Sequence, residues 1–407
     1  MQCVILAGGI GSRLGNLVRD TPKPMLDIAG EPFIVLLIRE IARFGFSHFL
    51  LLAGYKSQSI SDYFEHTDVD IPAGISVQVV VEPNILGTGG ALRGAAEYVE
   101  DEFLLCNGDS LCLFNILSFA QPFGVSGFLG RIALMFIEHN TRYGEVLLEG
   151  NRVLGFAERS RGKVAGHMNM GVYYMHRGLL EAIPPGKSSL EKDVFPKLAA
   201  AGVLEAYPVK PDFFIDIGIP EDLEKARAAI PEALKRPAVF FAGDCVVNQG
   251  YGHVHDVSDL PWILGARASI LACNDAGYYV FVVTGRASVA ERLYEETAMH
   301  ELHARMQSDL RMIGAHVDAF ASCPCHTEAL APELRYACEC RKPESAMLLR
   351  LIADWNIKRN SSFLIGAKVS DPQTAGDVGI HGHFFTGGNL LDTLLPCLSI
   401  YGHGTTA

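Results

Sequence analysis

The chain opens with an alternation of apolar runs and amphipathic stretches. A short apolar run at residues 2–7 is followed by a glycine-rich turn, and apolar positions then recur at helical spacing over residues 32–44. The next apolar run, at residues 49–53, has the length of a strand. Further strand-like runs follow at residues 77–81, 103–106 and 132–137. This alternation predicts an α/β domain with a mostly parallel sheet that carries helices on both faces.

The same pattern restarts in the second half of the chain. A helical stretch at 221–234 contains Pro231 and leads into a new apolar run at 238–241. The elements predicted beyond it are a helix near 264–276, a strand at 278–284, a helix near 288–306, a cysteine-rich loop, and another helix and strand. We therefore predict a fold of class α/β with two Rossmann-like domains, at 1–230 and 237–390, and leave 391–407 unassigned.

Length and composition agree with this picture of two compact domains. The chain has 407 residues, of which 49% are hydrophobic and 20% charged, and so it is long enough for two full cores. The net charge of −12 argues against general nucleic-acid binding, which needs clustered cations. No apolar run approaches the roughly 20 residues of a membrane helix, and no signal peptide precedes the first strand. We expect a cytoplasmic protein without membrane or nucleic-acid partners, and leave open whether it forms a homo-oligomer.

The glycine-rich turn after the first strand suits the binding of a triphosphate. Glycines allow backbone N–H groups to approach phosphate oxygens without obstruction from Cβ atoms. Arg13 follows the turn, and Lys23 stands between two prolines, which make a stiff mount for a cation. The residues that we expect to contact the nucleotide here are Leu6, Gly8, Gly9, Gly11 and Ser12.

With this spacing, the first 228 residues or so resemble the sugar-nucleotide pyrophosphorylase family. The resemblance implies a nucleotidyltransferase fold of the GT-A-like type. It also implies that Glu82 and the segment containing Gly87 and Thr88 seat the nucleobase and ribose. In the same family pattern, Asp109 after an apolar strand and Asp216 are the two carboxylates that hold a catalytic Mg²⁺, an ion that prefers oxygen ligands.

The resemblance further implies how substrates bind and react. The sugar phosphate would contact Gly144, Glu158, Lys163 and Asn169, although the family's usual Glu-Lys pair is here Glu158-Arg159. Its phosphate oxygen would attack the α-phosphorus of the nucleotide in line, and pyrophosphate would leave. The catalytic residues would be Arg13, Lys23, Asp109 and Asp216.

Four cysteines in the second half are spaced as two C-x-C pairs. Cys323 and Cys325 form one pair, Cys338 and Cys340 the other, with twelve residues between the pairs. Four thiolates from two short turns are typical of a tetrahedral Zn²⁺ site. Because the spacing implies no open coordination position, we predict that this zinc is structural.

Residues 237–388 or so resemble haloacid dehalogenase-type phosphatases, in particular the zinc-containing heptose bisphosphate phosphatase branch. The resemblance places Ala242 where the family has its aspartate nucleophile, and alanine cannot attack phosphorus. Asp244 retains the position of the general acid/base, and Ala367 replaces the later metal-binding aspartate. Thr284 and Lys342 remain at the phosphate-binding positions. We therefore expect a degenerate domain without phosphatase activity.

The two resemblances together suggest a substrate pair. A phosphatase acting on a heptose bisphosphate yields the heptose 1-phosphate that a guanylyltransferase consumes, so we prefer GTP with D-glycero-D-manno-heptose 1-phosphate. Mannose 1-phosphate is a rival sugar, and CTP, UTP and dTTP are rival nucleotides. Two other hypotheses are a bifunctional enzyme with a live phosphatase and a regulator that only binds a sugar nucleotide.

Overall fold

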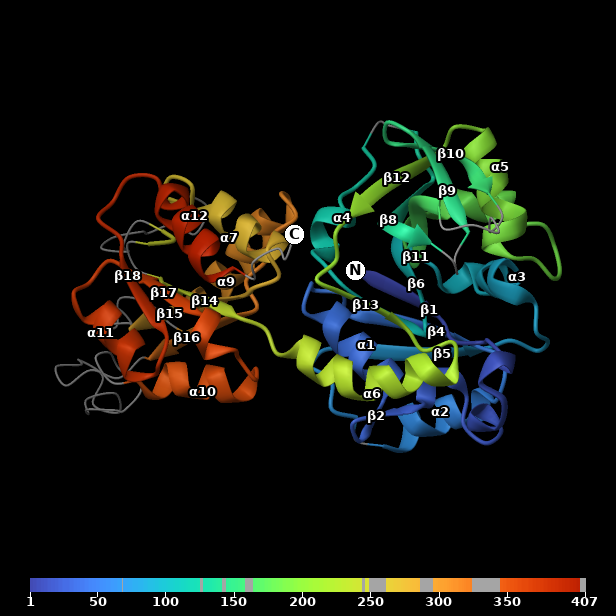
Figure 1. Ribbon diagram of the computed structural model, residues 1–407, viewed down its shortest axis with the longest axis horizontal. Coiled ribbons are helices and arrows are strands. Elements are labelled where there is room, and N and C mark those ends of the chain that lie inside the picture. Colours follow the sequence, from blue (N-terminus) through green and yellow to red (C-terminus); the bar gives the residue numbers. More distant parts are fainter. Residues whose placement is uncertain are drawn as a thin grey trace. The chain divides into compact units, whose positions relative to one another are not determined.

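The computed structural model divides the chain into two units, Met1–Glu232 and Ala233–Ala407 (Figure 1). The structure describes residues 1–67, 69–124, 127–140, 144–157, 164–243, 246–248, 261–285, 296–323 and 345–402. Each unit has its own sheet and its own hydrophobic core.

In its described residues, the first unit is built on a nine-stranded sheet. In spatial order its strands are β5 (Ser76–Val81), β4 (His48–Ala53), β1 (Gln2–Leu6), β6 (Glu102–Asn107), β11 (Val164–His176), β8 (Gly130–Asn140), β12 (Leu204–Val209), β10 (Arg152–Ala157) and β9 (Glu145–Glu149). Two short antiparallel pairs accompany it, the hairpin of β2 (Asp27–Ile28) with β3 (Glu31–Pro32), and the pair of β7 (Ser110–Leu113) with β13 (Phe213–Asp216), which are distant in sequence.

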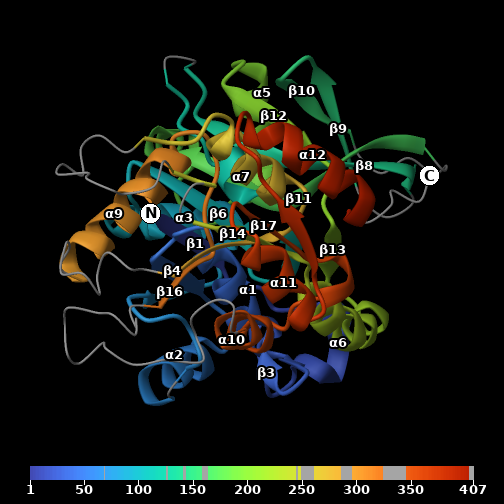
Figure 2. The same ribbon diagram turned by 90° about the vertical axis from the view of Figure 1, so that its left-hand side faces the viewer.

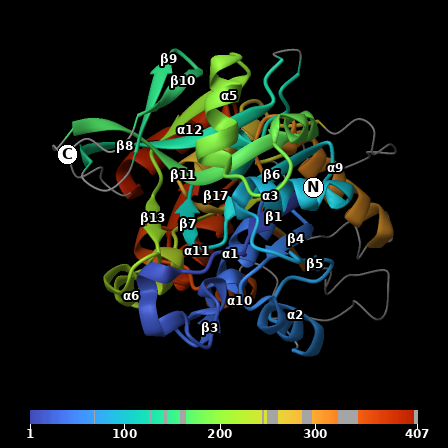
Figure 3. The ribbon, with the colours of Figure 1, turned by 90° about the vertical axis from the view of Figure 1, so that its right-hand side faces the viewer.

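This sheet is mixed, and the prediction of a mostly parallel sheet is wrong for its second half. Strands β5, β4, β1 and β6 are parallel, whereas β11 runs antiparallel to both β6 and β8. Strands β9 and β10 form an antiparallel hairpin, visible in Figure 3. Only two residues separate these strands, and a parallel connection needs a crossover of about a dozen residues or more.

Helices cover the first sheet on both faces. Alternate side chains of β1, β4 and β6 pack in one core with α3 and α5. Figure 1 shows α1 and α6 below the β1 and β4 end of the sheet. The helices of this unit are α1 (Phe33–Ala42), α2 (Ser57–His66), α3 (Gly87–Gly94), α4 (Ile116–Phe119), α5 (Phe195–Ala200) and α6 (Pro220–Leu234), with short turns η1 (Ser12–Val18), η2 (Lys23–Met25), η3 (Ala96–Tyr98), η4 (Arg177–Ala182) and η5 (Leu190–Val194).

The second unit has a five-stranded, fully parallel sheet in its described residues. The strand order is β16 (Ala319–Cys323), β15 (Tyr279–Gly285), β14 (Ala238–Ala242), β17 (Phe363–Gly366) and β18 (His381–Phe384). Its helices are α7 (Ala266–Asp275), α9 (Glu296–Arg311), α10 (Ala346–Asp354), α11 (Ser370–Asp377) and α12 (Leu390–Tyr401), with the turn η7 (Arg359–Ser361).

Adjacent side chains of β14 belong to two different cores, one on each face of this sheet. Phe241 packs in the core that includes α7 and α12, and Phe240 packs in the core that includes α10. Figure 2 shows α7 and α12 side by side, and the two helices are in contact. The alternation follows from the period of two along a strand, and it gives three layers, helix, sheet and helix.

Most of the predicted elements of the second unit agree with the structure. The helix near 264–276 and the strand at 278–284 are confirmed as α7 and β15. The helix near 288–306 is present as α9, which ends later, at Arg311, while residues 288–295 lie outside the described part of the chain. The stretch left unassigned contains most of α12, whose Leu394 and Cys397 are buried in the core. No helix in the described part of the chain has both the length and the apolar character needed to cross a bilayer.

Candidate active site

The glycine-rich loop starts at the carboxyl end of β1. Ala7 N–H still donates to Leu52 of the neighbouring strand, and the Gly8 carbonyl accepts from Tyr55 N–H at 3.3 Å. A Cβ atom at Gly8 would lie 2.5 Å from Glu82 Oε1 and 3.1 Å from Gly54 N, so a larger residue there would have to displace the Glu82 carboxyl. A Cβ atom at Gly9 would meet nothing within 4 Å, which leaves the backbone of this loop open to a ligand.

The loop then enters η1, which presents Arg13. Gly11 precedes this turn with φ of 67°, a left-handed conformation that favours glycine. Leu14 and Val18 of η1 are buried and anchor the turn, whereas Ser12 and Arg13 are exposed. The guanidinium group is therefore mounted on a fixed turn beside the glycines.

Lys23 lies in the short turn η2 between Pro22 and Pro24, and its side chain is buried. Its ammonium group contacts Asp109 Oδ2 and lies 3.8 Å from Asp216 Oδ1. A buried lysine requires paired charges of this kind, because desolvation of an unpaired ammonium group is costly. The Lys23 ammonium group therefore lies between the two carboxylates that were predicted to hold a metal ion.

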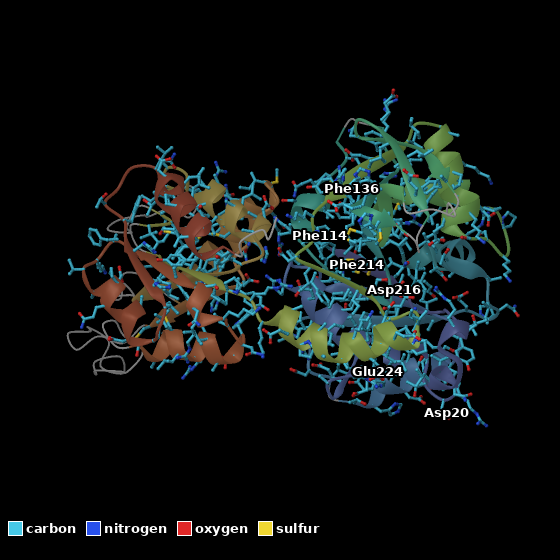
Figure 4. All side chains as sticks on the ribbon, in the orientation of Figure 1. Asp20, Phe114, Phe136, Phe214, Asp216 and Glu224 are labelled. Carbon is cyan, nitrogen blue, oxygen red and sulfur yellow. The ribbon has the colours of Figure 1, made fainter. Side chains whose placement is uncertain are left out.

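The two aspartates come from strand ends that are joined by hydrogen bonds. Asp109 lies in the short turn between β6 and β7, and Asp216 ends β13, where it pairs with Ser110 of β7 (Figure 4). Ile217 N–H donates to the Asp109 carbonyl at 3.0 Å. The Asp109 and Asp216 side chains are 30% and 18% exposed, so both carboxylates keep access to solvent.

Three of the four predicted catalytic residues, Arg13, Lys23 and Asp216, lie around Gly218, and Lys23 joins Asp109 to them. The Gly218 N–H donates to Asp216 Oδ1 at 2.5 Å, and a methyl group added at Gly218 would lie 2.6 Å from the same oxygen. That methyl group would also lie 3.2 Å from Lys23 Nζ and 3.3 Å from Arg13 Nη2. Four segments that are distant in sequence therefore bring two cations and two carboxylates together.

This donor set fits a divalent cation. Ionised carboxylates only accept, and they offer several lone-pair directions each. Asp109 and Asp216 already hold one cation, the Lys23 ammonium group. Mg²⁺ prefers oxygen ligands and commonly binds through one or two carboxylates together with substrate phosphates, so the residues present match its requirements.

Glu82 is placed at the carboxyl end of β5, against the glycine loop. Its Oε2 accepts from Leu86 N–H at 3.1 Å, and its Oε1 faces the backbone of Gly8 and Gly54. Burial raises the pKa of the Glu82 carboxyl, and the hydrogen bond from Leu86 partly offsets this effect. The carboxylate retains lone pairs that a ligand could use.

The Gly87–Gly90 run packs closely against a second segment of the same unit. A Cβ atom at Gly87, which has φ of 74°, would lie 2.6 Å from Ser188 O, and the same carbonyl accepts from Gly89 and Gly90 N–H. Because these glycines lack side chains, the backbone of Ser188 can pack directly against them, a contact that was not expected from the sequence. The Thr88 hydroxyl is engaged too, because it donates to Glu191 Oε2 at 3.0 Å.

The segment at 188–191 was missed as part of the site. A signal for it exists in the sequence, since Ser188-Ser189-Leu190-Glu191 has the S-x-x-E spacing of a helix start. Ser189 caps η5 with its side chain, which accepts from Lys192 N–H. The spacing predicts a cap at Ser188, one residue before the observed cap at Ser189, and it gives no hint that the turn meets Thr88.

Asn169 lies beside the Asn107-Gly108-Asp109 turn, at an irregularity of β11. The pairing of β11 with β8 shifts register between Asn169 and Tyr173. Gly171, with φ of 76°, comes so close to Asn107 that a Cβ atom there would lie 2.5 Å from Asn107 Nδ2. Asn107 therefore faces the same bulge, although the sequence analysis did not single it out.

The other residues nominated for the sugar are less fully placed. Gly144 is exposed at the start of β9, and a Cβ atom there would lie 3.2 Å from the Ala157 carbonyl at the end of β10. Glu158 and Lys163 lie outside the described residues.

In the second unit, the remnants of the nominated phosphatase site gather at the carboxyl ends of neighbouring strands. Ala242 ends β14, and Thr284 lies near the end of β15; both are buried. A Cβ atom at Gly243 would lie 2.6 Å from Thr284 Cγ2. Ala367 follows β17, where the buried Asp371 accepts from Lys368 N–H at 2.9 Å. Asp244 and Lys342 lie outside the described residues.

The nominated zinc ligands are mostly outside the described part of the chain. Cys323 ends β16 and is buried, whereas Cys325, Cys338 and Cys340 are not described. The described residues contain no group of three or more His, Cys, Asp or Glu side chains that could hold a metal ion. The zinc site therefore stays a prediction.

Comparison with known proteins assigns most of the first unit. A family described as nucleotidyl transferase matches residues 2–233. D-glycero-α-D-manno-heptose 1-phosphate guanylyltransferase of Aneurinibacillus thermoaerophilus is 32% identical over 230 residues, 56% of this chain and 97% of the relative. Mannose-1-phosphate guanylyltransferase catalytic subunit beta of Dictyostelium discoideum is 29% identical over 257 residues, 61% of this chain and 70% of the relative.

A relative of another kind also matches. D-glycero-β-D-manno-heptose-1,7-bisphosphate 7-phosphatase of Rhodopseudomonas palustris is 38% identical over 155 residues, which is 38% of this chain and 86% of the relative.

Proposed function

Because the chain belongs to the nucleotidyl transferase family, we propose that its first unit condenses GTP with D-glycero-D-manno-heptose 1-phosphate and releases pyrophosphate. The observation that carries the chemistry is that Lys23 lies between Asp109 and Asp216, with Arg13 beside them at Gly218. This arrangement combines cations for phosphate charge with carboxylates for a metal ion, as transfer of a nucleotidyl group requires.

In the proposed reaction an oxygen of the sugar phosphate attacks the α-phosphorus of the nucleotide. The bond from that phosphorus to the oxygen that bridges to the β-phosphate breaks, and pyrophosphate leaves. The open backbone at Gly9 and the exposed Arg13 would bind the triphosphate, and Lys23 would neutralise charge that develops on it. Mg²⁺ held by Asp109 and Asp216 would supply further neutralisation of the phosphate oxygens.

Glu82 supports GTP over the rival nucleotides. Guanine presents two adjacent donors on one edge, N1–H and the N2 amino group, and a carboxylate accepts both at once. Uracil and thymine offer a single donor there, and the cytosine amino group is flanked by an acceptor. The Glu82 carboxylate at the end of β5 is held in place by Leu86 N–H and faces the glycine loop.

Glu82→Gln is expected to raise KM for GTP by about tenfold, since each well-placed charged hydrogen bond contributes on the order of 1.5–3 kcal/mol. The raised pKa of Glu82 adds a pH dependence. Protonation turns the Glu82 carboxylate from an acceptor into a donor, so KM for GTP should rise as pH falls. Because the pKa of Glu82 is raised, this rise should begin at a higher pH than for a glutamate with an ordinary pKa. Initial rates at varied GTP and pH measure both effects, and an unchanged KM in the variant would remove Glu82 from the base site.

The sugar is proposed from the relatives. The match to the heptose 1-phosphate guanylyltransferase covers 97% of that relative, which favours a heptose 1-phosphate. The match to a mannose-1-phosphate guanylyltransferase makes mannose 1-phosphate the second candidate. The names of the two heptose relatives differ in anomer, α for the guanylyltransferase and β for the phosphatase. A test of the sugar therefore has to include both anomers.

The proposal is tested by Mg²⁺-dependent pyrophosphate release from the full-length protein. A grid should cross GTP, CTP, UTP and dTTP with both anomers of the heptose 1-phosphate and with mannose 1-phosphate. We expect a single dominant signal, for GTP with one heptose 1-phosphate. Silence across the grid would favour a protein that only binds a sugar nucleotide.

For the second unit we propose a phosphatase-like domain that has lost its activity. The phosphatase relative supports the family, and Ala242 at the end of β14 offers no carboxylate to form a phosphoenzyme. Assays with heptose 1,7-bisphosphate and Mg²⁺ are expected to release no phosphate above background. Robust release that disappears in Asp244→Asn would instead indicate a bifunctional enzyme.

A structural Zn²⁺ held by Cys323, Cys325, Cys338 and Cys340 belongs to the same proposal, and metal analysis of the purified protein would test it.

A further inference from the structure

Glu191 joins two segments of the first unit that are about a hundred residues apart in sequence. Its Oε2 accepts from the Thr88 hydroxyl at 3.0 Å and from the Ser189 hydroxyl at 2.8 Å. The Thr88 oxygen in turn accepts from Leu190 N–H at 2.9 Å. Both hydrogen-bonding directions of the Thr88 hydroxyl are therefore used within the protein, and they close a ring of contacts between α3 and η5.

This ring sits at the start of α3, next to the segment that the proposed function assigns to the nucleotide. Ser188 N–H donates to the Leu86 carbonyl at 2.8 Å, and Leu86 N–H donates to Glu82. The glycine contacts with the Ser188 carbonyl add two more hydrogen bonds between the same segments. These backbone hydrogen bonds hold the stretch beside Glu82, and none of them involves the side chain of Glu191.

Glu191 also borders the side of the site assigned to the sugar. Burial is the main cause that raises the pKa of the Tyr173 phenol, and the negative charge of Glu191 is the second. Tyr173 is fully buried, and its oxygen accepts from Asn169 Nδ2 at 2.9 Å. Asn169 Oδ1 accepts from Gly171 N–H, in the bulge that packs on Asn107. The charge of Glu191 therefore acts on the tyrosine that holds Asn169, while its hydrogen bonds are with Thr88 and Ser189.

We propose that Glu191 is a positioning residue of the transferase site, which fixes the start of α3 beside the proposed nucleotide site through its hydrogen bond with Thr88. The inference rests on the proposed function of the first unit. It assigns to the Thr88 hydroxyl a contact with protein and not with the nucleotide. Its expected effect is on the alignment of bound substrates, because positioning contributes to the rate of an in-line displacement without strengthening binding.

The test uses matched variants at both ends of the hydrogen bond. Thr88→Val and Glu191→Leu remove the donor and the acceptor with little change in volume, whereas Thr88→Ser and Glu191→Gln retain a hydroxyl and a side-chain oxygen that can bond. We expect kcat to fall by about tenfold in the Val and Leu variants, with KM for both substrates close to wild type. The Ser and Gln variants should keep most of the activity. Each apolar variant also loses one further bond, from Leu190 N–H to Thr88 or from the Ser189 hydroxyl to Glu191, so the Thr88→Val/Glu191→Leu pair should be about as active as the poorer single variant.

Other outcomes would overturn the inference. If Thr88→Val raises KM for the nucleotide while Glu191→Leu has no effect, the hydroxyl binds the nucleotide directly. If all four variants keep the wild-type kcat, the contact is structural only, and thermal melting of each variant would then report its role in stability. An inactive wild-type protein would count against the proposed function itself, and the two failures are therefore distinguishable.

Discussion

Asp109→Asn is expected to lower kcat for nucleotidyl transfer by about a thousandfold, in the range seen when one electrostatic group of an active site is removed. The substitution keeps the size of the side chain and an oxygen that can accept from Lys23. It removes the charge that pairs with the lysine and that would hold a divalent cation with Asp216. Pyrophosphate release at saturating substrates and Mg²⁺ measures the effect.

The matched control is Asp70→Asn, since the Asp70 side chain is 94% exposed and forms an ion pair with Arg39 at the surface. Pairs of this kind contribute little to stability, so this variant should retain full activity and a normal melting temperature. Removal of such an electrostatic group is expected to cost at least about a hundredfold in rate. An Asp109→Asn enzyme that keeps more than about a tenth of the wild-type kcat would therefore contradict the role of Asp109.

Gly218→Ala is expected to lower kcat by about a hundredfold, because a misplacement of about 1 Å in a catalytic group can cost that much. The added methyl group would lie 2.6 Å from Asp216 Oδ1 and 3.2 Å from Lys23 Nζ, closer than these atoms tolerate. The backbone at Gly218 does not have positive φ, so alanine brings no backbone strain. Initial rates and thermal melting of the same preparation separate the loss of activity from loss of fold.

Gly94→Ala is the control for this variant. Gly94 ends α3, it also lacks positive φ, and a Cβ atom there would meet nothing within 4 Å. Alanine at this position should leave the rates unchanged and stabilise the fold slightly, by up to about 1 kcal/mol. Equal rates in Gly218→Ala and Gly94→Ala would show that the crowding around Gly218 does not matter for the reaction.

The sequence predicted those parts of the fold that depend on local pattern. Strands β1, β14 and β15 stand out because they are buried on both faces, so their apolar runs are continuous. The mixed second half of the first sheet was harder to predict. Half-buried strands such as β9 and β10 are short, and their antiparallel pairing depends on a turn of two residues and not on any pattern within the strands.

The candidate site likewise contains residues that could be predicted from the sequence and one residue that could not. Arg13, Lys23 and Asp109 could be predicted because they follow a strand or stand in a rigid turn, where the side chains of an α/β sheet converge. Asp216 was predicted only from the resemblance to a family, and the catalytic roles of all four residues stay predictions. Glu191 could not be found in this way, since its partner Thr88 is 103 positions away and no local pattern records the contact.

The position of Lys23 between two carboxylates has a consequence for the order of events. Before nucleotide binds, the ammonium group acts as an internal counter-ion for Asp109, and a second cation approaching the carboxylates alone meets its repulsion. The phosphates of an incoming nucleotide offer the lysine a competing anion, and the Asp109 oxygen becomes available when they arrive. In the proposed reaction the site would therefore exchange one positive charge for another when the nucleotide binds.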